Sequence, residues 1–223
     1  MRYLQDLEVL EIEVLDHLNT IKVLPSLYFG GGTMLRLCHN LNRYSTDLDF
    51  WLDEAGDPKT LFIKIRERLS LRYKLSDAYD KRNTLLFEFR APRMTRNLKI
   101  EIRKQQKEFE WEKKIAFSRF SSKQVMVKGL TLTQMMKNKI GALLSRKLIR
   151  DAFDIEFLLM RGMALPAEKE TLTKMLNIVT GYKDRDFKVT LGSILEPGER
   201  AYYAVNRFQL LKEEITNGLN GLS

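Results

Sequence analysis

Two aspartates one residue apart, Asp47 and Asp49, are the side chains with the clearest chemical potential. The run that contains them alternates, with Leu48, Phe50 and Leu52 between the polar positions, and so predicts a strand. Both carboxylates then face the same side, about 6.6 Å apart along the chain. Like charges on a largely apolar strand repel each other, and a hard divalent ion such as Mg²⁺ (or Mn²⁺) would relieve that repulsion. The alternative is an exposed edge strand on which both acids are solvated.

A glycine cluster precedes the acid pair. Gly30, Gly31, Gly32 and Thr33 separate an apolar run at 26–29 from a segment of helical composition at 33–40. Glycines let the backbone approach an anion, and the unpaired N–H groups at a helix start favour phosphate. We therefore expect a phosphate cradle, with the Thr33 hydroxyl as part of it and as the N-cap of the helix. A tight turn without a ligand is the alternative.

A cradle followed by a metal-binding acid pair is what phosphoryl transfer from a nucleoside triphosphate requires. Such sites often carry a third acid. Glu101, in the alternating run 98–103, is the preferred candidate, and Glu88, in the similar run 84–90, is its rival.

The apolar pattern predicts an α/β half, then an all-helical half, with a boundary near 120–130. Helices are expected at 3–20, 33–40, 58–71, 131–147, 150–160, 167–179 and 198–217, and strands at 26–29, 47–52, 84–90, 98–103 and 124–128.

Composition limits the class of protein. The 223 residues carry a net charge of +9, which favours a polyanionic partner such as nucleic acid, or else a merely basic surface. A single cysteine, Cys38, excludes an internal disulfide and a multi-cysteine zinc site. Without an apolar run near 18 residues we expect no membrane contact and a cytoplasmic location. The basic run 90–114, with Phe109 and Trp111, could hold RNA by stacking or be a solvated face.

The order of motifs resembles the nucleotidyltransferase superfamily, in its AbiEii/AbiGii (MenT-like) toxin branch. The residues that carry the resemblance are Gly31-Gly32-Thr33, then Arg43-Tyr-Ser45-Thr-Asp47-Leu-Asp49-Phe50, and then Lys139 with Arg150-Asp151-Ala-Phe-Asp154. The similarity spans about residues 27–160. It implies an α+β fold, with a nucleotidyltransferase-like mixed sheet and flanking helices at 1–128 and a helical bundle at 129–223 that completes the active-site cleft.

The resemblance also implies roles. Asp47, Asp49, Lys139 and Asp151 would be catalytic, and the two aspartates with Glu101 would hold the metal. The nucleotide would be bound by Gly31, Gly32, Thr33, Arg43, Ser45, Lys139 and Arg146. Two departures stand out: Asn138 lies where an acid commonly precedes the lysine, and the third carboxylate is Glu101 rather than aspartate.

The second motif also has a simpler interpretation. Lys139 and Arg146 are seven residues apart and share a helix face, and Asp151 and Asp154 can share one as well. The alternative is a helix hairpin held by ion pairs of Arg150 and Arg146 with the two aspartates.

The glycines and the acid pair thus predict a metal-dependent nucleotidyltransferase. The resemblance implies a toxin that transfers a nucleotide from NTP to an RNA such as the tRNA 3′ end, with an antitoxin as a further partner. The acceptor hydroxyl would lose its proton to an aspartate or a metal-bound water, and pyrophosphate would leave. One alternative is a catalytically inactive module that binds nucleic acid or a protein. Another is a transferase that modifies a small molecule or a protein hydroxyl.

Overall fold

The structure, a computed structural model, describes residues 2–54, 56–92, 94–105, 107–165 and 168–221. The chain divides into two compact units, Met1–Thr131 and Leu132–Ser223. The sequence places the boundary after residue 128, and the structure places it after Thr131. Within the described residues, no helix has both the length and the apolar character needed to cross a membrane.

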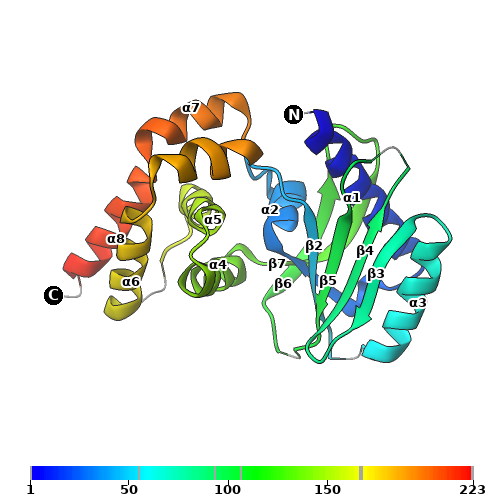
Figure 1. Ribbon diagram of the computed structural model, residues 1–223. Coiled ribbons are helices and arrows are strands. Elements are labelled where there is room, and N and C mark those ends of the chain that lie inside the picture. The colour runs from blue at the N-terminus through cyan, green and yellow to red at the C-terminus, as the bar shows by residue number, and fades with distance from the viewer. Residues whose placement is uncertain (1, 55, 93, 106, 166–167, 222–223) are drawn as a thin grey trace. The chain divides into compact units, whose positions relative to one another are not determined.

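The N-terminal unit is built on a seven-stranded mixed sheet with the order β3-β4-β5-β2-β1-β7-β6 (Figure 1). Its strands are β1 (Leu27–Gly30), β2 (Asp47–Leu52), β3 (Lys74–Asp80), β4 (Thr84–Arg90), β5 (Leu98–Arg103), β6 (Trp111–Phe117) and β7 (Gln124–Leu130). The β1–β7 and β2–β5 pairs are parallel, and the other pairs are antiparallel. The α+β fold predicted from the sequence is confirmed.

The side chains of β2 alternate between the two faces of the sheet, as predicted. Leu48, Phe50 and Leu52 are buried, and Phe50 stacks on Phe29 of β1 with ring centroids 5.0 Å apart. On this same face, Phe87 of β4 stacks on a ring of α3 (Pro58–Ser70) at 5.3 Å. The apolar face of the sheet is therefore the packed one, and the aspartates of β2 lie on the opposite face.

Helix α1 (Arg2–Thr20) carries two buried carboxyl groups into this unit. Glu8 accepts hydrogen bonds from Arg36 Nε at 2.9 Å and from Ser118 Oγ at 2.6 Å. Arg36 belongs to α2 (Gly31–His39), so the buried ion pair joins α1 to the helix that follows the glycine cluster. Glu11, one turn further along, is also buried, and its Oε1 has no hydrogen-bond partner.

Two strands and a short helix of the N-terminal unit were not predicted. The β3 sequence KLSDAYD is polar on both faces, and β6, WEKKIAF, exposes most of its side chains at the sheet edge, so neither shows a buried face. The 3-10 helix η1 (Leu24–Ser26) precedes β1.

The C-terminal unit is helical in all its regular elements that the structure describes. They are α4 (Leu132–Arg146), α5 (Ile149–Met160), α6 (Lys169–Thr180), the π-helix η2 (Asp186–Leu191), the 3-10 helix η3 (Gly192–Ile194), α7 (Pro197–Asn206) and α8 (Gln209–Gly221). The π-helix and η3 were not predicted. Gly162 follows α5 with a φ of +81°, the left-handed conformation in which many helices end.

The single helix predicted at 198–217 is wrong. Arg207 and Phe208 both adopt positive φ, 45° and 57°, and they separate α7 from α8. The Phe208 ring is fully buried, with centroids 5.5 Å from Tyr203 and 5.2 Å from Phe187. Burial of this ring offsets the strain of two left-handed residues that carry side chains. No glycine marks the break in the sequence.

The buried Glu11 generates a prediction about pH. Burial, then the charges of Glu8 and Asp47, raise the pKa of Glu11 well above its ordinary 4.5. A carboxyl whose pKa is raised on folding contributes stability below its unfolded pKa and loses that contribution as pH rises through the folded pKa. Relative to Glu11→Gln, the native protein should lose stability as pH rises above about 4.5.

Urea unfolding of both proteins between pH 4 and 8 measures this difference. Glu13→Gln, on the same helix at a half-buried position, is the matched control. Parallel stability curves for the native protein and Glu11→Gln would show that Glu11 does not titrate on folding.

Candidate active site

The glycine cluster and the acid pair meet at the start of α2. Strand β1 ends at Gly30, and α2 begins at Gly31, whose φ is +74°. A Cβ atom at Gly31 would lie 2.2 Å from Asp49 Oδ2 and 2.8 Å from Asp49 Cβ. Two constraints therefore require glycine at position 31: the positive φ of its backbone, and the carboxylate of Asp49, which leaves no room for a Cβ atom.

The next glycine lies against two other predicted nucleotide-binding residues. A Cβ atom at Gly32 would be 2.4 Å from Arg43 Nη2 and 2.9 Å from Ser45 Oγ. Arg43 is buried, with 3% of its surface exposed, and its Nη1 donates to the Tyr44 carbonyl at 2.9 Å. A buried guanidinium and a hydroxyl thus lie beside the first turn of α2, where backbone N–H groups have no partner within the helix.

Thr33 does not cap α2, so that prediction is wrong. The N-cap is Gly30, and Thr33 lies inside the helix, fully buried. Its Oγ1 donates to the Asp47 carbonyl at 2.5 Å. The expected phosphate-facing hydroxyl instead fastens α2 to the first residue of β2.

Strand pairing places Glu101 next to the acid pair. Asp49 is the register partner of Glu101 across the parallel β2–β5 pair, and Asp47 is the partner of Lys99. All four side chains belong to the same face, since register partners point the same way. Glu101 accepts a hydrogen bond from Lys99 Nζ at 2.7 Å. That bond, with the charges of Asp47 and Asp49, raises the pKa of Lys99 against the effect of desolvation.

The rival acid lies one strand further away. Glu88 on β4 is the register partner of Lys99 on one side and of Asp77 on the other, and it accepts from Asn97 Nδ2 at 2.8 Å. Register therefore favours Glu101 as the acid beside Asp49, and its role as a third metal ligand stays a prediction.

The donor set fits a hard divalent ion. Asp47 and Asp49 are half-buried carboxylates on one face, and Mg²⁺ is commonly held by one or two carboxylates together with substrate phosphates. Among the described residues, no group of three or more His, Cys, Asp and Glu side chains is arranged to hold a metal ion. Glu101, tied to Lys99, is not part of such a group.

Sequence reasoning missed Lys99, Glu8 and Glu11 as members of this region. A signal for the two glutamates existed, because positions 4, 8, 11, 15 and 18 form one stripe on α1 that is otherwise leucine. A carboxyl group in such a stripe must be buried and must either find a cation or become neutral. Glu8 has Arg36, whereas Oε1 of Glu11 finds no hydrogen-bond partner in the part of the chain that the structure describes.

The second motif forms a buried ionic cluster within the helical unit. Asp151 and Asp154 on α5 are fully buried. Lys139 Nζ on α4 lies 2.6 Å from Asp154 Oδ2 and 3.8 Å from Asp151 Oδ1. Arg146 holds Asp151 through two bonds, at 2.8 and 2.7 Å. The cluster therefore balances two carboxylates with two cations.

The structure thus brings Lys139, Arg146 and Asp151 together with Asp154, and the roles of these residues in catalysis and nucleotide binding stay predictions. The two cations differ in access: the Lys139 side chain is 7% exposed and that of Arg146 is 41% exposed. Asn138, where the motif departs from its usual acid, accepts from Gln134 Nε2 at 3.0 Å and leaves its buried Nδ2 without a partner.

The sequence matches the family of AbiEii nucleotidyl transferase toxins, of the type IV toxin–antitoxin systems, over residues 13–215. The chain belongs to the AbiEii family. Its members are nucleotidyl transferases, so the enzyme class predicted from the glycines and the acid pair is confirmed, as is the resemblance itself. None of the curated protein sequences is close enough to count as a match.

Solved structures agree with this AbiEii assignment in fold. JHP933 from Helicobacter pylori is 19% identical with a TM-score of 0.56, and the match covers 98% of this chain and 96% of JHP933. The nucleotidyltransferase toxin MenT4 from Mycobacterium tuberculosis H37Rv is 16% identical with a TM-score of 0.57, covering 97% and 92% of the two chains. At these identities the similarity is one of fold.

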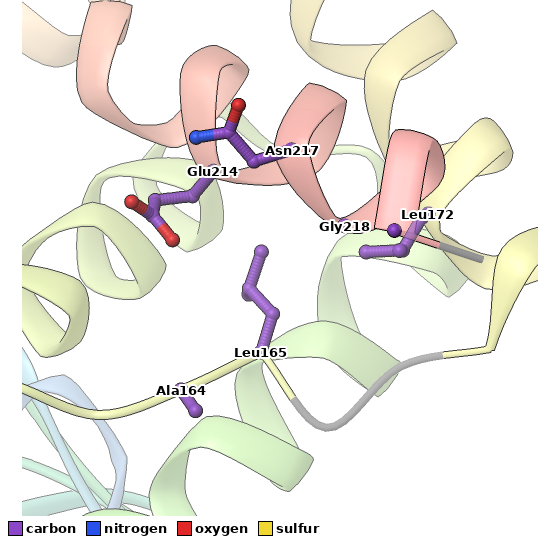
Figure 2. Close-up of a pocket in the computed structure, with 7 residues that line it drawn as sticks. Ala164, Leu165, Leu172, Glu214, Asn217 and Gly218 are labelled. Carbon is purple, nitrogen blue, oxygen red and sulfur yellow. The ribbon is translucent and has the colours of Figure 1, made fainter. Parts of the chain in front are cut away.

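A pocket of about 400 Å³ lies elsewhere in the helical unit of this AbiEii protein. Figure 2 shows Leu165 directed toward α8, on which Glu214, Asn217 and Gly218 lie. Its lining offers aliphatic carbon and the carboxylate of Glu214, which would repel a phosphate. The pocket therefore does not fit the triphosphate of a nucleotide.

The contact between Gly31 and Asp49 predicts a large effect of a single methyl group. Gly31→Ala should cost at least about 1–2 kcal/mol of stability, because alanine is strained at positive φ. It should also weaken NTP binding, since the new Cβ must displace the Asp49 carboxylate. Chemical denaturation and nucleotide titration measure the two effects.

Gly141→Ala is the matched control, because a Cβ there meets nothing within 4 Å on α4. It should gain roughly 0.5–1 kcal/mol and bind NTP normally. Equal behaviour of the two variants would rule out the close approach at Gly31.

In the buried ionic cluster, a second substitution should restore the stability that is lost when one partner of an ion pair is removed. Lys139→Met removes the cation that lies 2.6 Å from the buried Asp154 carboxylate and should cost about 3–5 kcal/mol. Adding Asp154→Leu removes the carboxylate of this pair as well and should restore most of that stability, since apolar replacements of buried pairs are often neutral. Urea unfolding of both variants measures this, and a double variant no more stable than the single one would contradict it.

Proposed function

We propose that this chain is a metal-dependent nucleotidyltransferase toxin that transfers a nucleotide from NTP to the 3′ hydroxyl of an RNA such as tRNA. The single observation that carries the proposal is the contact of Gly31 with the Asp49 carboxylate. It joins the start of a helix, which favours phosphate, to an acid pair that favours a divalent ion. A triphosphate with its metal satisfies both at once.

Each residue of the N-terminal unit has a task in this proposal. The first turn of α2, with Gly31 and Gly32, receives the triphosphate on its backbone N–H groups. Arg43, buried beside Gly32, adds a fixed positive charge and cannot deprotonate. Ser45 Oγ, beside the same glycine, supplies a hydroxyl donor.

Asp47 and Asp49 would hold Mg²⁺ or Mn²⁺, which supplies Lewis-acid stabilisation of the phosphates when bound. The acceptor hydroxyl oxygen bonds to the α-phosphorus, the bond from that phosphorus to the bridging oxygen breaks, and pyrophosphate leaves. The hydroxyl proton passes to a carboxylate of the pair. Lys99, held by Glu101, keeps a positive charge beside the acids and limits their mutual repulsion.

In the helical unit, Lys139 and Arg146 are the proposed phosphate contacts and Asp151 the residue that orients them. The exposure of Arg146 and its two bonds to Asp151 support this, since a guanidinium held by one carboxylate is fixed in direction. The rescued variant Lys139→Met with Asp154→Leu separates this role from stability, because it should fold and still lose transfer.

The family also supports a protein partner, since its systems pair a toxin with an antitoxin. An antitoxin that counteracts this chain is therefore part of the proposal.

Labelled triphosphates, Mg²⁺ and total tRNA test the proposed reaction. We expect labelled RNA with at least one nucleotide, and a loss of at least about 100-fold for Asp47→Asn and for Asp49→Asn, because the metal contributes several kcal/mol. Asp77→Asn, on the edge strand β3, should transfer normally.

No transfer to RNA with any nucleotide, under conditions where the protein binds NTP, would overturn the RNA assignment. If the labelled nucleotide in a cell extract appears on a protein or on a small molecule, the acceptor hydroxyl belongs to that molecule and not to RNA. Persistent toxicity of the Asp47→Asn variant, with RNA affinity intact, would favour a binding module, for which the net charge of +9 is the supporting observation.

A further inference from the structure

A row of aromatic and basic side chains crosses the sheet face that carries the acid pair. Trp51 on β2 is the register partner of Arg103 on β5 and of Tyr28 on β1. Tyr28 in turn is the partner of Lys128 on β7, which pairs with Lys113 on β6. Two rings therefore lie side by side with a cation at one end and two at the other.

The cations lie over the rings. Arg103 Cζ is 4.8 Å from the Trp51 ring centroid, and Lys128 Nζ is 5.5 Å from that of Tyr28 and 5.1 Å from that of Trp111. These are cation–π distances. Lys128 Nζ also lies 2.6 Å from Asp53 Oδ2. The row is thus a constrained arrangement of rings and charges rather than a set of loose surface side chains.

The row begins beside the reacting groups. Trp51 follows Asp49 by two residues on the same face, about 7 Å along the strand. A Cβ at Gly30, the register partner of Asp49, would lie 2.4 Å from Trp51 Cζ3, so the indole reaches toward the glycine cluster. That spacing along the strand corresponds to roughly two stacked nucleotides.

Two further rings form the outer surface of this group. Phe109 lies 5.8 Å from Tyr28 and 5.6 Å from Trp51, and Trp111 lies 6.0 Å from Tyr28, centroid to centroid. Trp51 and Tyr28 are only 6% and 9% exposed, whereas Trp111 is 39% exposed and Phe109 is half-buried. The accessible faces therefore belong to Phe109 and Trp111.

We propose that Phe109 and Trp111, backed by Trp51 and Tyr28, stack the bases of a single-stranded RNA acceptor next to its reacting 3′ end. Stacking on aromatic faces beside basic side chains is the common way to hold single-stranded nucleic acid, and it tolerates any base. The inference rests on the proposed function, because it takes the acid pair as the place where the RNA terminus reacts.

Charge favours RNA over a protein as the occupant. Arg103 and Lys113 are exposed at the two ends of the row, and the whole chain carries +9. Part of this positive charge is offset near Tyr28 by three carboxylates, those of Asp53, Glu54 and Glu108. Charge therefore favours RNA as the occupant, but stacking must supply most of the affinity for it. The rings, not the lysines, are therefore the residues to test.

The two tryptophans of the chain, Trp51 and Trp111, both lie in this group, so tryptophan fluorescence, excited selectively over that of tyrosine, reports on it alone. A short single-stranded oligoribonucleotide is titrated into the full chain with EDTA and without NTP. We expect quenching, and anisotropy of a labelled oligonucleotide gives the affinity. Phe109→Ala and Trp111→Ala should each weaken binding roughly 5- to 150-fold, which corresponds to about 1–3 kcal/mol per stacked base.

Tyr202→Ala is the matched control, since Tyr202 is a 51% exposed ring on α7. It should bind the oligonucleotide like the native protein. Circular dichroism establishes that the variants fold, and Phe109→Leu, which keeps an apolar side chain without a π-face, should lose affinity as well.

Asp49→Asn separates this inference from the proposed function. RNA that still binds in a ring-dependent way when transfer is absent supports the stacking surface even if the proposed reaction fails. Oligonucleotide affinity equal in Phe109→Ala, Trp111→Ala and Tyr202→Ala overturns it. It is also overturned if the ring variants lose NTP binding with RNA affinity unchanged, or if they lose only a protein partner.

Discussion

Electrostatic repulsion between carboxylates on one sheet face is the constraint around which the N-terminal unit is arranged. Asp47 and Asp49 share that face, and Glu101 is the cross-strand neighbour of Asp49. Lys99 offsets part of the repulsion by holding Glu101 and by its own charge beside the aspartates. Burial, with the charges of Glu8 and Asp47, raises the pKa of Glu11 and favours its neutral form, so the fold does not add a further buried charge. The remaining repulsion is what a divalent metal ion would relieve.

The sequence predicted the parts of the fold whose periodicity comes from burial. Strand β2 was identified because Leu48, Phe50 and Leu52 alternate with polar residues, and the same alternation correctly placed Asp47 and Asp49 on one face. Strands β3 and β6 could not be predicted in this way, since both lie at sheet edges and lack a consistently buried face. The break at Arg207 and Phe208 was invisible because it depends on aromatic packing between distant residues.

For the candidate site, sequence order identified the elements but not their local contacts. Thr33 illustrates the limit: a hydroxyl after glycines predicts a cap, yet its nearest acceptor is the Asp47 carbonyl, fourteen residues later. Lys99 could not be given a role from the sequence, because only the strand register shows that it is opposite Asp47. In the helical unit an ion-paired hairpin is present, with Arg146 on Asp151 as the simpler interpretation expected. Lys139, which the family resemblance assigns to phosphate, holds Asp154, a pairing that the simpler interpretation did not include.

The close approach of Gly31 to the Asp49 carboxylate has a consequence for how such chains can diverge. Position 31 tolerates no side chain while the carboxylate is in place. A lineage that discards the acid also releases the steric part of the restriction on the glycine, whereas the reverse order passes through a clash. Substitutions at the two sites should therefore accumulate in one order, and among homologues a bulky residue at position 31 would signal that the carboxylate was lost first.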